Sequence, residues 1–116
     1  MAEQNPGEPF IRVSVAEAKG KLDSESAVMV DVRNQDEFDE IHATGVLHIP
    51  VNNVLTSVGQ IRDFSGGKEI LFVCKSGQRS ALAAEYATAA GLVEVPLMNV
   101  EGGTEAWVEA GYPTGD

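Results

Sequence analysis

Short apolar segments alternate with segments of helical spacing along this 116-residue chain. Residues 10–13, 27–31, 70–73 and 96–100 are rich in apolar side chains, as buried strands are, and a brief strand is expected at 48–49. Strands that alternate with helices favour a parallel sheet with helical crossover connections. We therefore expect an α/β fold, a three-layer sandwich with a central, mostly parallel sheet of about five short strands and helices on both faces.

The segments between these strands begin with recognisable capping patterns. Ser14 and Glu17 match a capping box at the start of the first helix, and Asn34 with Glu37 can cap the second. Further helices are predicted from the spacing of apolar residues and from alanine content at residues 51–61, 81–90 and 104–109.

The only cysteine stands at the end of the apolar run 69–73. Residues 74–80 read Cys-Lys-Ser-Gly-Gln-Arg-Ser and connect that strand to the alanine-rich helix. Backbone N–H groups in such a turn and at a helix N-terminus converge on one point, where they stabilise an anion or a thiolate. Lys75 and Arg79 add positive charge, so we expect a lowered pKa and a nucleophilic role for Cys74.

The charge balance of the chain restricts its partners. The formal net charge is −10, and nucleic-acid binding requires concentrated Lys and Arg, so no nucleic-acid partner is expected. Lys75 and Arg79 are two of only eight basic residues, which makes the cysteine loop a positive spot on an acidic surface. Such a spot favours a small anionic ligand.

The chain length suits one domain, expected over residues 10–116, with residues 1–9 as a flexible polar lead-in. No stretch predicts a membrane span. A lone cysteine excludes an internal disulfide and a two-cysteine redox or metal pair, which fits a reducing compartment, and we expect the cytoplasm. His42 and His48 have no partners at metal-ligand spacing, so no metal is expected.

Asp31 and Arg33 bracket the end of the strand at 27–31. They are expected to form an ion pair that supports the neighbouring loop, with a place for Arg33 at the pocket rim as the alternative. Trp107 is read as core or pocket wall, Gly102 and Gly103 as a tight turn. The acidic run at 36–40 is read as a solvated helix face.

Three motifs follow one another along nearly the whole chain. The first is Val30-Asp31-Val32-Arg33 with Glu37, Phe38, His42, Gly45, Ile49 and Pro50; the second is Cys74 to Ser80; the third is Glu101-Gly102-Gly103 with Trp107, Gly111 and Pro113. Together they resemble the signatures of the rhodanese-type sulfurtransferases.

This resemblance implies an enzyme that moves a sulfane sulfur from thiosulfate or a similar donor to a thiophilic acceptor, through a persulfide on Cys74. Cyanide is the assay acceptor, and an external low-molecular-weight thiol or thioredoxin-like protein the cellular one. No cofactor beyond the covalent persulfide is implied. The residues expected to bind the donor are Lys75, Ser76, Gly77, Gln78, Arg79 and Ser80.

Two alternatives remain at this point. Rhodanese-like domains also occur as regulatory or sulfur-carrier modules with little turnover, although modules without activity usually lack the cysteine. Cysteine-dependent phosphatases and arsenate reductases use an anion loop with five residues between cysteine and arginine. Only four separate Cys74 from Arg79, which favours sulfur transfer.

Overall fold

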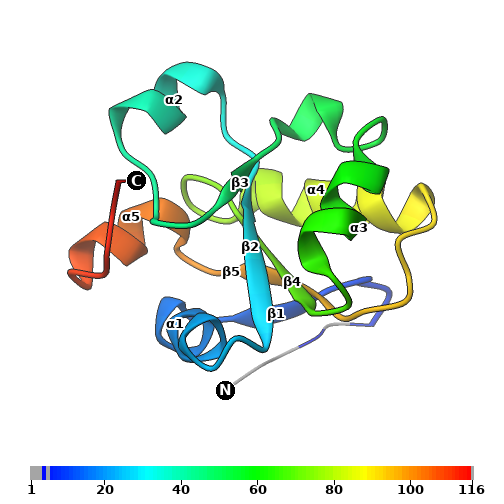
Figure 1. Ribbon diagram of the computed structural model, residues 1–116, viewed down its shortest axis with the longest axis horizontal. Helices are drawn as coiled ribbons and strands as arrows, with labels where there is room; N and C mark the ends of the chain where they lie inside the picture. Colours follow the sequence, from blue (N-terminus) through cyan, green and yellow to red (C-terminus); the bar gives the residue numbers. More distant parts are fainter. Residues whose placement is uncertain (1–3, 5, 116) are drawn as a thin grey trace.

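The computed structural model of the protein describes residue 4 and residues 6–115. Within these residues, five strands form one sheet in the order β1-β5-β4-β2-β3, and every neighbouring pair is parallel (Figure 1). This arrangement confirms the α/β fold expected from the alternating pattern. The strands are β1 (Ile11–Val13), β2 (Ala27–Asp31), β3 (Leu47–His48), β4 (Glu69–Val73) and β5 (Leu97–Val100).

Helices connect the strands and lie on both faces of the sheet (Figure 1). They are α1 (Val15–Asp23), α2 (Gln35–Glu40), the 3₁₀ turn η1 (Val51–Asn53), α3 (Val58–Ser65), α4 (Gln78–Ala89) and α5 (Gly103–Glu109). The capping box predicted for the first helix is present, because Ser14 and Glu17 satisfy each other's backbone N–H groups at 3.0 Å.

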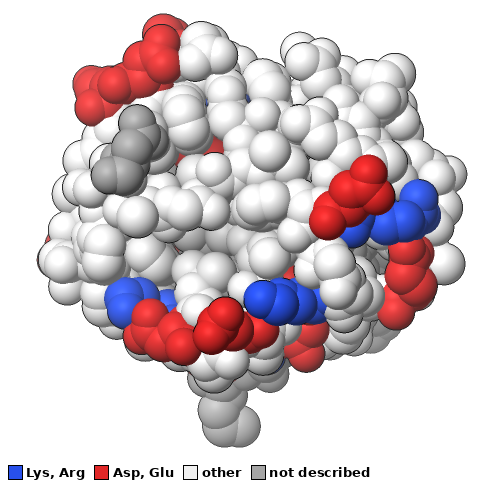
Figure 2. Space-filling view, viewed as in Figure 1, with Lys and Arg blue, Asp and Glu red and all other residues white. Residues whose placement is uncertain are grey.

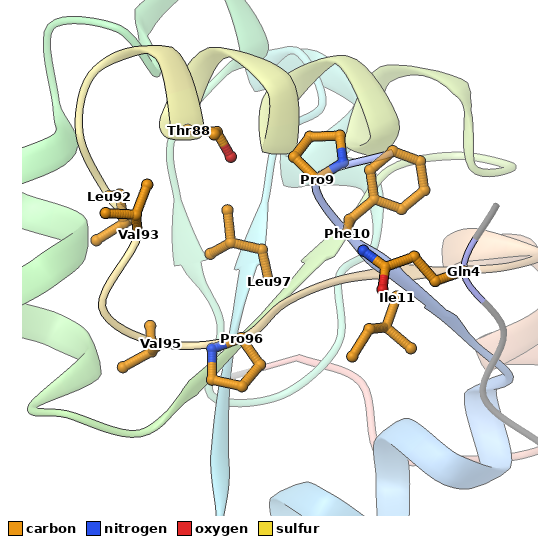
Figure 3. A pocket seen from close by; sticks show the side chains of 10 residues that line it. All are labelled: Gln4, Pro9, Phe10, Ile11, Thr88, Leu92, Val93, Val95, Pro96 and Leu97. Atoms are coloured by element: carbon orange, nitrogen blue, oxygen red, sulfur yellow. The ribbon is translucent and has the colours of Figure 1, made fainter. Parts of the chain in front are cut away.

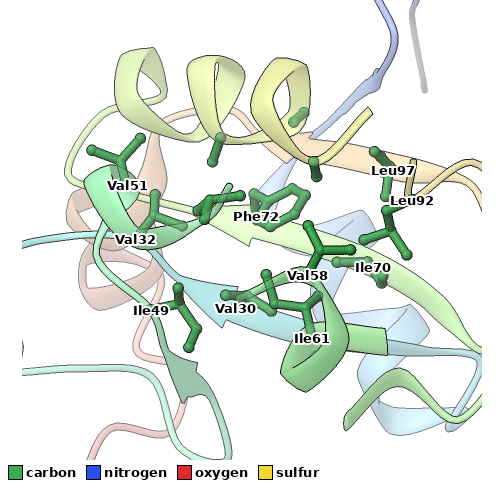
Figure 4. Close-up of a cluster of buried hydrophobic side chains, with 14 of the residues drawn as sticks. Val30, Val32, Ile49, Val51, Val58, Ile61, Ile70, Phe72, Leu92 and Leu97 are labelled. Carbon is green, nitrogen blue, oxygen red and sulfur yellow. The ribbon is translucent and has the colours of Figure 1, made fainter. Parts of the chain in front are cut away.

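Alternate side chains along the strands build two separate cores. Val30, Ile70 and Phe72 point to one face and pack with α3, α4 and η1 (Figure 4). Leu71 and Val73 point to the other face, in the cluster that α1 and α5 complete. Because successive strand residues face opposite sides, a sheet covered on both faces needs continuous apolar runs such as β4.

Several predicted boundaries shift by one residue or more, and three of the differences concern the elements around the site. The helix predicted at 51–61 is split into η1 and α3, with Ser57 at the N-cap position of α3. The brief strand expected at 48–49 pairs one residue earlier, as Leu47–His48. The helix predicted at 81–90 begins at Gln78, because Gly77 with a φ of 118° provides its N-cap.

The expected lead-in at 1–9 falls partly outside the described residues. Within the described part, the Glu8 carboxylate accepts hydrogen bonds from the Arg12 guanidinium of β1, one of them from Nε at 3.1 Å. Within the same part of the chain, each helix is too short or too polar to cross a membrane.

The register of the sheet brings the ends of three strands together. Asp31 of β2 is aligned with Val73 of β4, and Phe72 of β4 with Asn99 of β5. Residues that follow these strands therefore meet at one edge of the sheet, the carboxyl edge where ligand sites of parallel sheets form. Cys74 lies at this edge.

Candidate active site

Cys74 immediately follows β4, and its side chain is buried, with 1% of its surface exposed. Its Sγ accepts a hydrogen bond from the backbone N–H of Gly77 at 3.0 Å and lies 3.4 Å from Ser80 Oγ. Gly77 adopts a left-handed conformation that L-residues with side chains rarely reach. The sulfur thus rests in a tight turn at the N-terminus of α4.

Opposing effects set the pKa of the Cys74 thiol. Burial raises it, but the Ser80 hydroxyl and the backbone N–H groups of Ser80, Gly77 and Ser76 stabilise the thiolate by hydrogen bonds, and the pKa is lowered overall. The partial positive charge of the α4 N-terminus acts in the same direction. The main groups that lower this pKa are therefore neutral donors, whereas the sequence pattern also indicated a contribution from the flanking cations.

Gln78, Arg79 and Ser80 belong to the first turn of α4 and not to a loop, which corrects the predicted loop at 74–80. The connection between β4 and α4 is only Cys74 to Gly77. The helix start was predicted too far downstream because the prediction followed the alanine-rich run. In the structure, the turn already ends at Gly77. Ser80 is fully buried, whereas Ser76 and Gln78 are exposed.

Arg79 forms a bidentate ion pair with Glu37 of α2. The guanidinium nitrogens Nη1 and Nη2 lie 2.6 and 2.9 Å from the two carboxylate oxygens. This contact is the chief reason that the pKa of Glu37 is lowered to about 2, and it raises the pKa of Arg79. Glu37 was predicted to cap α2, which it does through the N–H of Asn34, but its pairing with Arg79 was missed.

Asp31 and Arg33 form the predicted ion pair, and it is buried. Arg33 Nε lies 3.0 and 3.1 Å from the two oxygens of Asp31, and Nη2 lies 2.8 Å from Oδ2. Nη2 also donates to the Ile41 carbonyl at 2.6 Å, which attaches the end of α2 to the sheet. Arg33 also lines the cleft described next, so both readings of this residue fit.

A cleft of about 420 Å³ opens beside the cysteine turn, between α2 and α5. Three of its lining side chains are acidic and two are basic. Figure 2 shows acidic side chains gathered at the upper left, where α2 with its acidic residues lies in Figure 1. Lys75 is exposed there and is the cation nearest in sequence to Cys74. The lining residues are Arg33, Glu37, Glu40, Ile41, Lys75, Thr104, Glu105 and Val108.

Gly103 brings α5 against the cysteine turn. Its φ is 57°, and a Cβ there would lie 2.4 Å from the Cys74 carbonyl oxygen and 2.5 Å from that of Lys75. The close approach lets the N–H of Thr104 donate to the Cys74 carbonyl at 2.8 Å. The tight turn expected at Gly102 and Gly103 thus has a second role, since it positions one wall of the cleft.

Comparison with known proteins decides the family. The family model described as the rhodanese-like domain matches residues 14–110. This chain belongs to that family. The cysteine lies at the carboxyl edge of a parallel sheet, in a turn that opens a helix, as its motifs predicted.

Two curated proteins are similar to this chain over most of its length. “Putative sulfur carrier protein YrkF” of Bacillus subtilis (strain 168) is 34% identical over 96 residues, which are 82% of this chain but 49% of that protein. The chain therefore spans about half the length of that relative. “Thiosulfate sulfurtransferase GlpE” of Vibrio cholerae serotype O1 is 30% identical over 104 residues, 90% of this chain and 93% of that one.

A solved structure also matches the rhodanese-like domain. RPA3614 of Rhodopseudomonas palustris CGA009, described as a protein of unknown function and “Possible Tyrosine Phosphatase”, superposes with a TM-score of 0.77 at 29% identity. The match covers 88% of this chain and 82% of that chain.

The remaining candidate residues of the rhodanese-like domain have structural contacts. His42 and His48 both stack on Phe38, with ring centroids 3.8 and 4.3 Å apart, and His48 Nε2 contacts the Arg33 carbonyl at 2.7 Å. Within the described residues, no group of three or more His, Cys, Asp or Glu side chains is placed to hold a metal. Trp107 is core: it is 2% exposed and donates to the Pro113 carbonyl at 2.8 Å.

Sequence reasoning also missed Asn99, whose side chain is buried beside the turn. Its Oδ1 accepts from the Ser80 hydroxyl at 2.5 Å, and its Nδ2 donates to the Gly77 carbonyl at 3.1 Å. A polar residue inside the apolar strand Leu97–Val100 was the available signal, because buried amides need hydrogen-bond partners.

A second pocket, of about 280 Å³, lies away from Cys74 between the C-terminal part of α4 and the starts of β1 and β5 (Figure 3). Apolar side chains such as Phe10, Val93 and Leu97 predominate in its lining, and none of the described residues that line it is ionisable.

Proposed function

We propose that this rhodanese-like domain is a sulfurtransferase that carries sulfur as a persulfide on Cys74. The observation that supports the proposal most is the hydrogen bond from the Gly77 N–H to Sγ at 3.0 Å in a turn that lowers the pKa of the thiol. A stabilised thiolate is the nucleophile that such chemistry needs. The relation to GlpE, named a thiosulfate sulfurtransferase, supports the donor class.

In the first half-reaction, the Cys74 thiolate would attack the outer sulfur of thiosulfate with an electron pair. The bond between that sulfur and the sulfonate sulfur breaks, and its electron pair leaves with sulfite. The products are an anionic persulfide on Cys74 and a sulfite dianion, so atoms and charge balance. The backbone N–H groups that face Sγ would stabilise the persulfide anion.

In the second half-reaction, a thiophilic acceptor would remove the outer sulfur. Cyanide attacks that sulfur, the persulfide bond breaks, and thiocyanate leaves while the Cys74 thiolate is restored. A thiolate acceptor would give a new persulfide in the same way. Since the chain has one cysteine, the acceptor would come from outside.

Lys75 and Arg79 would bind the oxyanion end of the donor, with Lys75 taking the larger share. Lys75 is exposed in the cleft beside Cys74, whereas the guanidinium of Arg79 already contacts Glu37. A carboxylate partner reduces the field that an arginine offers to a second anion. Electrostatic stabilisation of the departing sulfite is the contribution we assign to both cations.

The test is intact mass spectrometry of the reduced protein after thiosulfate, then after cyanide. We expect the gain of one sulfur atom with thiosulfate and its loss with cyanide. The Cys74→Ser variant should gain none, and Ser24→Ala, an exposed position after α1 that keeps the thiol, should behave as the wild type. Sulfur gain by Cys74→Ser would overturn the mechanism.

A sulfur carrier that serves a dedicated partner is the second candidate, favoured by the similarity to YrkF. It would use the same Cys74 persulfide but release the sulfur slowly to small acceptors. Mass spectrometry of samples quenched at successive times distinguishes the enzyme from the carrier. An enzyme returns to its unmodified mass within its turnover time after cyanide or a small thiol is added. A carrier would hold its sulfur.

A phosphatase or arsenate reductase is the third candidate, raised by the description of RPA3614. The shorter spacing of four residues between Cys74 and Arg79 weighs against it. Assays with a small aryl phosphate and with arsenate test this candidate directly. Turnover of either compound, lost in Cys74→Ser, would replace sulfur transfer as the proposed function.

A further inference from the structure

The sulfur of Cys74 belongs to a closed ring of hydrogen-bonding groups. Ser80 Oγ lies 3.4 Å from Cys74 Sγ and 2.5 Å from Asn99 Oδ1. Asn99 Nδ2 donates to the Gly77 carbonyl at 3.1 Å, and the Gly77 N–H donates to Sγ at 3.0 Å. Cys74, Ser80 and Asn99 are each at most 4% exposed, so solvent does not supply alternative partners freely.

The Gly77 carbonyl fixes the orientation of the Asn99 amide. A carbonyl oxygen can only accept, so the NH₂ group of Asn99 must face Gly77 and its oxygen must face Ser80. Ser80 has a single hydroxyl hydrogen. While that hydrogen points to Asn99, only lone pairs of Ser80 Oγ face the sulfur.

Two hydrogen-bond arrangements follow, one for each protonation state of the sulfur. A Cys74 thiol donates its S–H to Ser80, which donates to Asn99. A thiolate has no hydrogen to give, so the Ser80 hydroxyl must turn its hydrogen to Sγ, and Asn99 Oδ1 then loses its donor. Asn99 and the thiolate compete for one hydrogen.

We propose that Asn99 is a positioning residue that directs the Ser80 hydroxyl hydrogen, and thereby sets the balance between thiol and thiolate at Cys74. When the sulfur becomes the neutral inner atom of a persulfide, it no longer attracts that hydrogen, which returns to Asn99. The hydroxyl thus changes direction once in each half-reaction. This last step rests on the proposed function, whereas the competition in the sulfur-free protein does not.

The charged groups near the turn stay the same when the hydroxyl hydrogen of Ser80 changes direction. Lys75 and Arg79 come from the turn and α4, Glu37 of α2 pairs with Arg79, the Asp31–Arg33 pair follows β2, and Glu105 of α5 donates its N–H to the Lys75 carbonyl. The hydrogen bonds that act on the thiolate come from neutral groups, the Ser80 hydroxyl and backbone N–H groups. Substitutions at Asn99 leave every one of these charges in place.

The test is a double-variant cycle read through the pH dependence of Cys74 alkylation by iodoacetamide, followed by mass spectrometry. Asn99→Leu removes the competing acceptor, so the pKa of Cys74 should fall by about 0.5 to 1, as expected for one hydrogen bond. Ser80→Ala should raise it. In the Ser80→Ala background, Asn99→Leu should cause no further change.

A purely structural role predicts a different result. If Asn99 served only to hold the Gly77 carbonyl, Asn99→Leu would loosen the turn and change the pKa of Cys74 equally in both backgrounds. That outcome, or a rise in pKa for Asn99→Leu alone, overturns the proposal. Neither depends on sulfur transfer, so failure of the thiosulfate experiment is a separate result.

A second measurement needs no change at Asn99. In isotope-labelled wild-type protein, the side-chain amide signals of Asn99 should shift with pH at the midpoint of Cys74 titration, because Oδ1 loses its donor there. In Ser80→Ala the shift should disappear. Signals that stay constant through the thiol titration of the wild type would contradict the competition.

Discussion

Two arginine–carboxylate pairs lie near the cysteine turn, and they differ in burial and in chain separation. Asp31 and Arg33 are two residues apart, with side chains 0% and 5% exposed. Glu37 and Arg79 are 42 residues apart, with side chains 27% and 30% exposed. The buried pair holds the sheet edge, whereas the half-exposed pair can respond to ligands and solvent.

Breaking the buried pair should have the largest effect on stability. Arg33→Met leaves the Asp31 carboxylate buried without its partner and removes the donor to the Ile41 carbonyl, which should lower the free energy of unfolding by about 3 to 5 kcal/mol. Urea denaturation measures it. The double variant Asp31→Asn/Arg33→Met should recover part of the loss. A loss below about 1 kcal/mol would mean that the buried pair contributes no more to stability than an exposed ion pair does.

Under the proposed function, breaking the half-exposed pair should affect donor use more than stability. Glu37→Gln frees the guanidinium of Arg79, so kcat/KM for thiosulfate should rise about threefold to tenfold, or about 0.7 to 1.4 kcal/mol. Glu40→Gln is the matched control, because Glu40 lies on the same helix and lines the same cleft. Equal gains in both variants would indicate a general charge effect rather than release of Arg79.

Acid should reveal the stability that the half-exposed pair contributes. The pKa of Glu37 is about 2 in the folded protein and 4.5 ordinarily, so its contribution is complete above pH 4.5 and is lost as pH falls through about 2. With solvent screening, we expect about 1 kcal/mol between wild type and Glu37→Gln at neutral pH. Denaturation at several pH values measures the difference, and a difference that grew towards low pH would have the wrong sign.

A change in salt concentration should give the smallest effect, and it should distinguish the two ion pairs most clearly. Raising the ionic strength from about 0.05 to 0.5 M shortens the screening length, and should remove a few tenths of a kcal/mol from the Glu37–Arg79 pair. The stability difference between wild type and Arg33→Met should stay constant, because the buried pair is shielded from ions. Equal salt dependence of both pairs would contradict the comparison.

Sequence reasoning succeeded where the partners are close in the chain. The Asp31–Arg33 pair, the Ser14–Glu17 capping box and the position of Cys74 after a buried strand were each predicted from a few neighbouring residues. The parallel sheet followed from the alternation of elements, because parallel strands need crossover connections.

The contacts that the sequence did not reveal join distant segments. Glu37 meets Arg79 across 42 residues and Asn99 meets Ser80 across 19, and no spacing rule predicts either. The start of α4 was misplaced for a different reason. Helix propensity identified the alanine run, whereas the left-handed φ of Gly77 sets the boundary.

The contact of Gly103 with the Cys74 carbonyl gives the two walls of the cleft unequal freedom. On the α5 side, main chain packs against main chain with room for nothing larger than hydrogen, so this wall is held closely against the cysteine turn. On the α2 side, an ion pair forms the link to α4, and it can lengthen or exchange partners. The cleft should therefore adjust its width from the α2 side, while the sulfur keeps its place.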